Sequence, residues 1–127
     1  MYIGRFAPTP SGPLHFGSIV TAIASFLDAK SNEGKWLVKI DDIDWPRVVN
    51  GSDISILNNL ERLHLYWDMP VVYQSHRIKE YQNQLELLKK MNVTYSCQCS
   101  RRDILKSSIT GVDGYIYPGT CREKKIK

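Results

Sequence analysis

The residues best suited to chemistry lie in a loop near the N-terminus of the chain. His15, Gly17 and Ser18 form a His-x-Gly-Ser string at the end of a segment rich in proline and glycine. Proline keeps such a segment from becoming helical, and glycine lets a ligand approach the backbone closely. A helix that begins after the loop points the free N–H groups of its first turn toward it, and anionic phosphate is the natural ligand. A simple turn in an α/β protein is the plainer alternative.

A second polar group follows a predicted strand at residues 36–40. Asp41, Asp42 and Asp44 come directly after this strand, and Arg5 lies in an earlier one. Ligands of an open parallel sheet bind beyond the carboxyl ends of the strands. An arginine and an acidic cluster in one crevice suit a zwitterion, because arginine pairs with a carboxylate and aspartate holds an ammonium group. A solvated strand end and a metal-binding cluster are the alternatives for the aspartates.

Three cysteines, Cys97, Cys99 and Cys121, lie in the last third of the chain. Cytosolic thiols stay reduced, so a Cys-x-Cys string followed by a third cysteine indicates zinc rather than a disulfide. Structural zinc usually takes four protein ligands, and no histidine lies in this region. The fourth ligand is then a carboxylate such as Asp103 or Asp113, a tyrosine, or water.

The elements that position these groups follow from the hydrophobic pattern. Strands are predicted at residues 2–6 and 36–40, and a helix at 18–32 lies between them, closed by Gly34 at a C-cap position. Such a βαβ unit requires a parallel sheet. The fold class is therefore α/β.

Two further helices are predicted downstream. Ser52 is expected to N-cap the first, Ser75 to cap the second, and Asn92 to end the second. A short strand is expected at residues 93–97. Each helix carries an apolar stripe expected to be buried in the core. The stripes are Ile56, Leu57, Leu60 and Leu63 in the first helix, and Ile78, Tyr81, Leu85, Leu88 and Met91 in the second.

The composition of the 127 residues is that of a globular chain with a net charge of +4. A mild basic excess agrees with a polyanionic partner without requiring one. No apolar run approaches the length of a membrane span, and the N-terminus lacks a signal-peptide pattern. We therefore expect a cytoplasmic, monomeric protein with no membrane partner. Much of the excess lies in the last quarter, at Arg101, Arg102, Lys106, Arg122, Lys124, Lys125 and Lys127.

The whole run Arg5-Phe-Ala-Pro-Thr-Pro-Ser-Gly-Pro-Leu-His15-Phe-Gly17-Ser18 resembles the "HIGH" signature region of the class I glutamyl-tRNA synthetase family. Ser18 in place of the final histidine resembles the glutamyl-Q branch of that family in particular. The resemblance implies the N-terminal part of a class I synthetase Rossmann-type parallel sheet with a zinc-binding insertion. It divides the chain into a partial catalytic domain at residues 1–96 and a zinc-binding segment with a basic tail at 97–127.

The family joins glutamate and ATP into a glutamyl-adenylate and releases pyrophosphate, so positioning and electrostatic stabilisation do the work. The resemblance implies that Asp41 contacts the ammonium group of glutamate, although Lys39-Ile-Asp41 stands where the family has Arg-Ile-Glu. His15, Gly17 and Ser18 are the implied catalytic residues, and with Pro8 they bind ATP accompanied by Mg²⁺. The other implied contacts to glutamate are Arg5, Phe6, Ala7, Pro8 and Thr9.

The string Tyr117-Pro-Gly-Thr-Cys121 resembles a Tyr-x-x-x-Cys pair of the glutamyl-Q branch, which holds zinc together with Cys-x-Cys. The resemblance therefore implies a zinc site formed by Cys97, Cys99, Tyr117 and Cys121.

The implied function is ATP-dependent activation of glutamate and its transfer to the queuosine base of tRNA(Asp), with L-glutamate, ATP and that tRNA as partners. One alternative is a fragment of an ordinary glutamyl-tRNA synthetase. Another is a non-catalytic, zinc-stabilised module that binds nucleotide or RNA. The resemblance covers less than half of a complete family member, and no Lys-x-Ser-Lys string like the family's second signature occurs. We therefore expect little or no ligase activity from these residues alone.

Overall fold

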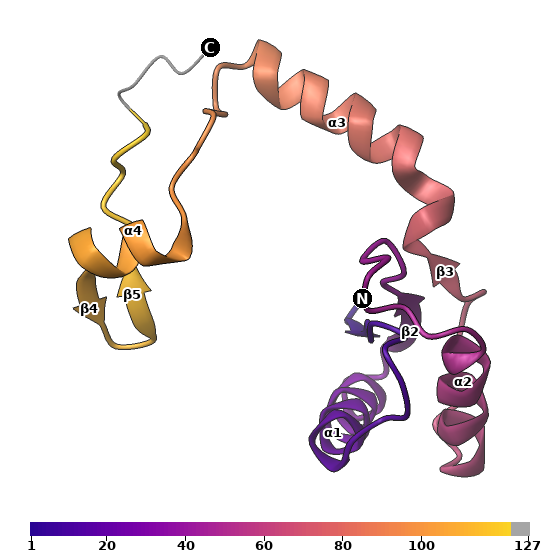
Figure 1. Ribbon diagram of the computed structural model, residues 1–127. Coiled ribbons are helices and arrows are strands. Elements are labelled where there is room, and N and C mark those ends of the chain that lie inside the picture. The colour runs from indigo at the N-terminus through magenta and orange to yellow at the C-terminus, as the bar shows by residue number, and fades with distance from the viewer. Residues whose placement is uncertain (123–127) are drawn as a thin grey trace. The chain divides into compact units, whose positions relative to one another are not determined.

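The structure is a computed structural model in which residues 1–122 are described (Figure 1). The chain forms two compact units, the first spanning Met1–Lys79 and the second beginning at Glu80. The predicted division at residue 96 concerns where the zinc-binding segment starts, and it stays a prediction.

The first unit contains the predicted βαβ motif, formed by β1 (Ile3–Phe6), α1 (Phe16–Ser31) and β2 (Lys35–Ile40). α2 (Ser52–Arg62) follows and leads to β3 (Val72–Tyr73). The strands are parallel in the order β1-β2-β3. Both crossovers move across the sheet in one direction, so right-handed connections place α1 and α2 on the same face. The predicted α/β fold with a parallel sheet is confirmed.

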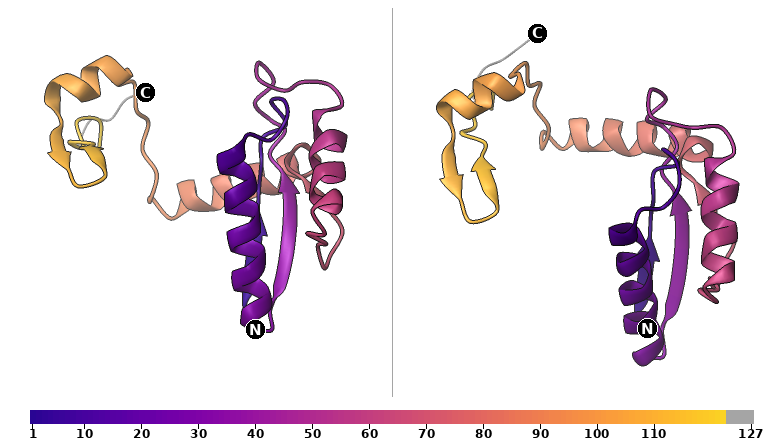
Figure 2. Two further views of the ribbon diagram at one scale, coloured as in Figure 1. Left: turned by 90° about the horizontal axis from the view of Figure 1, so that it is seen from below. Right: turned by 60° about the horizontal axis from the view of Figure 1, so that its bottom comes forward.

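The core of this unit lies between the sheet and its two helices (Figure 2). Alternate strand residues point into it, because successive side chains of a strand face opposite sides. Small residues on α1 let the helix approach the strands closely. The buried residues are Phe6, Trp36, Val38 and Ile40 from the strands, Ala22 and Ala29 from α1, and Ile56, Leu60 and Leu65 from α2 and the segment after it.

α1 ends in a Schellman motif that differs in one position from the prediction. The N–H of Gly34 donates to the carbonyl of Ala29 at 2.8 Å, and the N–H of Glu33 donates to that of Lys30 at 3.1 Å. Glu33, not Gly34, adopts the left-handed conformation, with φ 51°. Gly34 is required for a different reason, because a Cβ there would lie 2.5 Å from the carbonyl oxygen of Tyr2.

The predicted caps of the later helices are wrong at two serines. Gly51, with φ 76°, is the N-cap of α2, and Ser52 is its first helical residue. Ser75 lies in a 3-10 turn, η1 (Gln74–Arg77), that precedes α3 (Ile78–Lys90). Its N–H and hydroxyl donate to Asp42 instead. Asn92, with φ 55°, follows the end of α3 as predicted.

The two apolar stripes have different outcomes. Ile56 and Leu60 of α2 are fully buried and Leu57 packs against the core, whereas Leu63 at the C-cap is 43% exposed. The stripe of α3 is not buried by any described element. A sequence pattern fixes which side of a helix is apolar, but burial requires a covering surface as well. The exposed members are Ile78, Tyr81, Leu85, Leu88 and Met91.

The described part of the second unit contains α4 (Arg101–Ser107) and an antiparallel hairpin of β4 (Ile109–Gly111) and β5 (Gly114–Ile116). The strand predicted at residues 93–97 is wrong, because this segment has no regular structure. Among the residues that the structure describes, no helix has the length and apolar character needed to cross a membrane. The basic residues predicted at 124, 125 and 127 lie outside the described residues.

Neighbouring substitutions at the end of α1 test its geometry. Gly34→Ala is expected to lower the free energy of unfolding by about 1–3 kcal/mol, because the added Cβ meets the backbone of Tyr2. Glu33→Gly is the matched control and is expected to change it by no more than about 1 kcal/mol, since glycine relieves the left-handed strain. Urea denaturation followed by circular dichroism measures both. Equal effects would contradict this assignment of roles.

Candidate functional site

The loop between β1 and α1 is held by the segment that follows β2. The N–H of Asp41 donates to the carbonyl of Pro8 at 3.0 Å, and the N–H of Val49 donates to that of Pro10 at 2.8 Å. Because proline has no N–H, these carbonyls are the only backbone hydrogen-bonding groups of the two prolines. The shape of the loop therefore depends on residues far away in the sequence.

His15 is the N-cap of α1. Its ring Nδ1 accepts a hydrogen bond from the N–H of Ser18 at 3.2 Å, and its Nε2 lies 3.0 Å from the hydroxyl oxygen of Ser18. A neutral ring whose Nδ1 accepts carries its proton on Nε2. In this tautomer Nε2 is the ring's donor, and the hydroxyl oxygen of Ser18 is its acceptor.

Gly17 provides room for this histidine ring. A Cβ at Gly17 would lie 3.1 Å from Cε1 and 3.2 Å from Nδ1 of His15. Contacts this close would require the ring to shift by a few tenths of an ångström. In the structure, the space that Gly17 leaves is therefore occupied by the His15 ring, and the catalytic role of His15 stays a prediction.

A pocket of about 350 Å³ opens beside the loop and the start of α1. This volume lies within the range of small-molecule sites, roughly 300–1,000 Å³. Among the other lining residues, Arg47 supplies a cationic side chain. The predicted site residues that line the pocket are Phe6, Ala7, Pro8, Thr9, His15 and Ser18.

Arg5 and Asp41 are outside the lining of this pocket. Arg5 pairs with Leu37 in the strand register and is exposed, on the opposite face of the sheet from Phe6. Asp41 follows the last residue of β2, and its Oδ1 lies 2.6 Å from Nζ of Lys39. Lys39 and Asp41 are the two positions at which Lys-Ile-Asp replaces the Arg-Ile-Glu string of the family. In the structure these two residues form an ion pair with each other.

The other two aspartates of the cluster have separate partners. Asp42 accepts hydrogen bonds from the N–H and hydroxyl of Ser75. Partial burial raises the pKa of Asp42, but the bonds from Ser75 outweigh this effect and hold the pKa below its usual value. Asp44 forms an ion pair with Arg47, whose Nε donates to it at 2.7 Å. Among the described residues these aspartates do not converge on one metal position.

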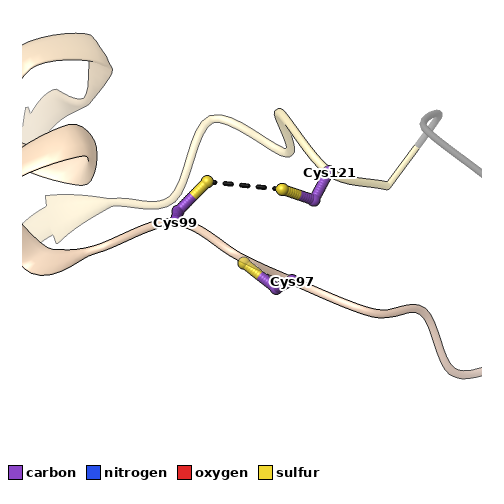
Figure 3. Close-up of side chains that lie close together, drawn as sticks. All are labelled: Cys97, Cys99 and Cys121. Carbon is purple, nitrogen blue, oxygen red and sulfur yellow. Dashed lines mark hydrogen bonds between the residues drawn. The ribbon is translucent and has the colours of Figure 1, made fainter. Parts of the chain in front are cut away.

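The three cysteines come together in the second unit. The Sγ atoms of Cys97, Cys99 and Cys121 all lie within 4.8 Å of one another (Figure 3). Those of Cys99 and Cys121 are 3.3 Å apart. Two thiolates on one tetrahedral zinc, each with a Zn–S bond of about 2.3 Å, are about 3.8 Å apart. The sulfur positions fit a single zinc ion.

Tyr117 joins this cluster. Its hydroxyl oxygen lies 3.3 Å from Sγ of Cys97 and 3.8 Å from Sγ of Cys99, and it accepts a hydrogen bond from the N–H of Cys121. The hydrogen bond with Cys97 contributes most to raising the pKa of Tyr117. A backbone hydrogen bond from Gln98, followed by one from Tyr117, lowers the pKa of Cys121 to about 7. A thiolate, the form that binds zinc, is therefore accessible near neutral pH.

The carboxylates considered as a fourth ligand lie elsewhere. Asp103 accepts hydrogen bonds from the N–H and hydroxyl of Ser100 and completes a capping box at the start of α4. These bonds hold the pKa of Asp103 below its usual value. Among the described residues, neither Asp103 nor Asp113 belongs to the cysteine cluster. Of the candidate groups among the described residues, Tyr117 is the one that lies beside the three cysteines.

Sequence reasoning missed two residues at the loop. Ser52 was expected to cap a helix, but its hydroxyl contacts Gly12, which lies 40 positions earlier in the chain. No local pattern encodes such a pairing. Arg47, which lines the pocket, could have been considered from the sequence, because it follows Asp44 by three residues and could pair with it in the acidic segment after β2.

Comparisons with known proteins agree with this geometry. The family described as tRNA synthetases class I (E and Q), catalytic domain, matches residues 3–110. The chain is 49% identical over 123 residues to a glutamyl-Q tRNA(Asp) synthetase of Dechloromonas aromatica, covering 95% of this chain and 41% of the relative. It is 48% identical over 126 residues to the protein of that name in Vibrio parahaemolyticus, covering 99% and 41%.

A solved structure is also similar. A glutamate tRNA ligase from Elizabethkingia meningosepticum, crystallised in complex with its amino acid, matches with a TM-score of 0.69 and 31% sequence identity. The match covers 82% of this chain and 22% of that one. The chain spans about two fifths of the length of its curated relatives. It belongs to the class I tRNA synthetases of the glutamyl and glutaminyl group and represents part of their catalytic domain.

Proposed function

We propose that this chain is the signature-loop part of an ATP-dependent ligase that activates glutamate and transfers it to the queuosine base of tRNA(Asp). The main support is the pocket lined by Phe6–Thr9, His15 and Ser18, in a chain 49% identical to a relative named glutamyl-Q tRNA(Asp) synthetase. In the proposal Pro8, His15 and Ser18 hold the nucleotide, and Phe6, Ala7, Pro8 and Thr9 contact the amino acid.

In the proposed reaction the glutamate carboxylate attacks the α-phosphate of ATP and pyrophosphate leaves. Negative charge builds on the phosphoryl oxygens, so donors fixed in advance stabilise the transition state. The hydroxyl of Ser18 is one such donor, and the Nε2–H of His15, which lies 3.0 Å from that hydroxyl oxygen, is a second once it turns to a phosphoryl oxygen. Arg47 adds a positive charge to the pocket lining. ATP is accompanied by Mg²⁺ as its counterion.

The proposed zinc ion has a structural role. Cys97, Cys99, Tyr117 and Cys121 would hold it, and this donor set of three sulfurs and one oxygen suits zinc. Zinc would cross-link the segment before α4 to the segment after β5. The described part of the second unit buries few side chains, so such a cross-link would supply stability that packing does not.

A binding module without catalysis is the second candidate, because the chain spans only 41% of its relatives. It predicts binding of ATP or RNA and no adenylate formation. A glutamyl-tRNA synthetase part is the third, and it predicts charging of whole tRNA(Glu). The identity of 31% to the glutamate tRNA ligase, against 49% to the glutamyl-Q protein, favours the queuosine acceptor.

The proposed activity is tested in a chimera that joins this chain to the uncovered part of the Dechloromonas aromatica relative. We expect the chimera to catalyse glutamate-dependent exchange of pyrophosphate into ATP, and to glutamylate tRNA(Asp) that carries queuosine but not tRNA(Glu). The 127 residues alone are expected to give exchange near background. The relative, cut and rejoined at the same junction, is the control. Exchange absent from the chimera but present in this control would overturn the proposal.

The proposed role of His15 is tested in the same chimera. His15→Ala is expected to lower the exchange rate by about 10² or more, because a donor to the transition state is lost. His76→Ala, at an exposed position outside the pocket lining, is the matched control and should leave the rate unchanged. Circular dichroism checks that both variants fold. An unchanged rate in His15→Ala would remove this residue from the mechanism.

Zinc content tests the cysteine cluster. We expect about one zinc ion per chain by elemental analysis of metal-replete protein, and well under half of this in Cys99→Ser, which removes a thiolate ligand. Tyr117→Phe should also weaken zinc retention against a chelator, because it removes the hydroxyl near Cys97. Tyr115→Phe, in the hairpin, is the matched control. Zinc at trace levels in the unaltered protein would refute the site.

A further inference from the structure

We propose that Ser52 is a positioning residue for the nucleotide pocket, because its side chain fixes the backbone of Gly12 in the signature loop. Ser52 itself does not line the pocket, whereas Gly12 does. The inference rests on the proposed function of the loop in nucleotide binding, and it adds a residue from α2 to the machinery of that site.

The contact uses both hydrogen-bonding groups of the Gly12 backbone. The N–H of Gly12 donates to Oγ of Ser52 at 2.9 Å, and the Ser52 hydroxyl donates to the carbonyl of Gly12 at 2.7 Å. A hydroxyl carries one donor and two acceptor sites, so one serine satisfies both groups at once. Ser52 is only 6% exposed, so water does not readily replace it.

This serine is free for the task because it does not cap its own helix. The N-cap of α2 is Gly51, and no side chain caps that end. Serine at the first turn of a helix commonly bonds to the backbone of its own helix. Here the hydroxyl is used 40 positions away instead, which is a tertiary role.

Gly12 is the point at which the loop needs an external restraint. Its φ of 135° is a conformation that other residues rarely adopt, and a Cβ there would meet nothing within 4 Å. Glycine is therefore needed at this position for its backbone conformation and not for close packing. Glycine is also the residue that leaves such a conformation most easily. A restraint at Gly12 sets the direction of the chain toward His15.

Of the three contacts that hold this loop, two are made by the backbone amides of Asp41 and Val49. Almost any residue at those positions would provide the same N–H. The contact at Gly12 depends on the side chain at position 52. If this contact is lost, the loop becomes ordered only when the ligand binds, and the free energy needed to order it lowers the affinity for the ligand.

The test uses the 127-residue chain with Ser52→Ala, Ser52→Thr and Ser55→Ala. Ser55 is exposed on the same helix and serves as the matched control. In Ser52→Ala we expect the Gly12 amide to exchange with solvent about tenfold faster by NMR, and ATP to bind about tenfold more weakly by calorimetry. Ser52→Thr keeps the hydroxyl and should restore both. Ser55→Ala should change neither.

Each outcome of these measurements supports or overturns the role of Ser52. Equal Gly12 exchange in Ser52→Ala and the unaltered chain would overturn the inference, as would faster exchange with unchanged ATP affinity. If Ser52→Ala fails to fold, the Gly12 amide of the unaltered chain is decisive, since an unprotected amide there also overturns it. Absence of ATP binding by the unaltered chain would instead count against nucleotide binding by the loop, while Gly12 exchange would still report on the contact with Ser52.

Discussion

The pocket beside the loop after β1 depends on one constraint, which is that this loop is anchored to the segment after β2. The loop contains prolines that lack N–H groups and a glycine with a positive φ, so it makes little regular structure of its own. Its shape comes from hydrogen bonds to Asp41, Val49 and Ser52. Since these residues are ordered by the end of β2 and the start of α2, the pocket requires the whole first unit to be folded.

This constraint explains which features the sequence could predict. The first two strands, α1 and the α/β class follow from local patterns of alternating and helical periodicity, and they were predicted correctly, whereas β3, β4 and β5 were not predicted and the strand predicted at residues 93–97 is absent. The end of α1 was predicted to within two residues. The residue in the left-handed conformation is Glu33 rather than Gly34, and glycine is needed at position 34 because the chain there passes close to the backbone of Tyr2. The role of Ser52 was hidden, since its partner lies 40 positions away. The apolar stripe of α3 was correctly located on the helix, but its burial depends on a covering surface that the described residues do not provide.

The cysteine cluster shows the same division between local and distant information. The spacing of Cys97 and Cys99 predicted a metal site, and left a carboxylate, tyrosine or water as the fourth ligand. Asp103 is near in sequence but is used locally, in the capping box of α4. Tyr117 is brought in by the β4–β5 hairpin, which returns the chain toward the cysteines. Spacing could not choose between these residues, because the choice depends on the path of the chain between them.

The ion pair of Lys39 and Asp41 bears on the role predicted for Asp41. The predicted role of Asp41 is to hold the ammonium group of the substrate, yet its carboxylate already has a cation at 2.6 Å. The side chains of Lys39 and Asp41 are 19% and 32% exposed, and Oδ1 of Asp41, the atom in the contact, is itself buried, so this ion pair is not a solvent-exposed surface pair. The predicted contact with an ammonium group therefore requires Asp41 to exchange Lys39 for the substrate or to hold both cations. Aspartate also places its carboxylate one methylene closer to the backbone than the family's glutamate, so the contact with Lys39 fixes the position of this shorter group.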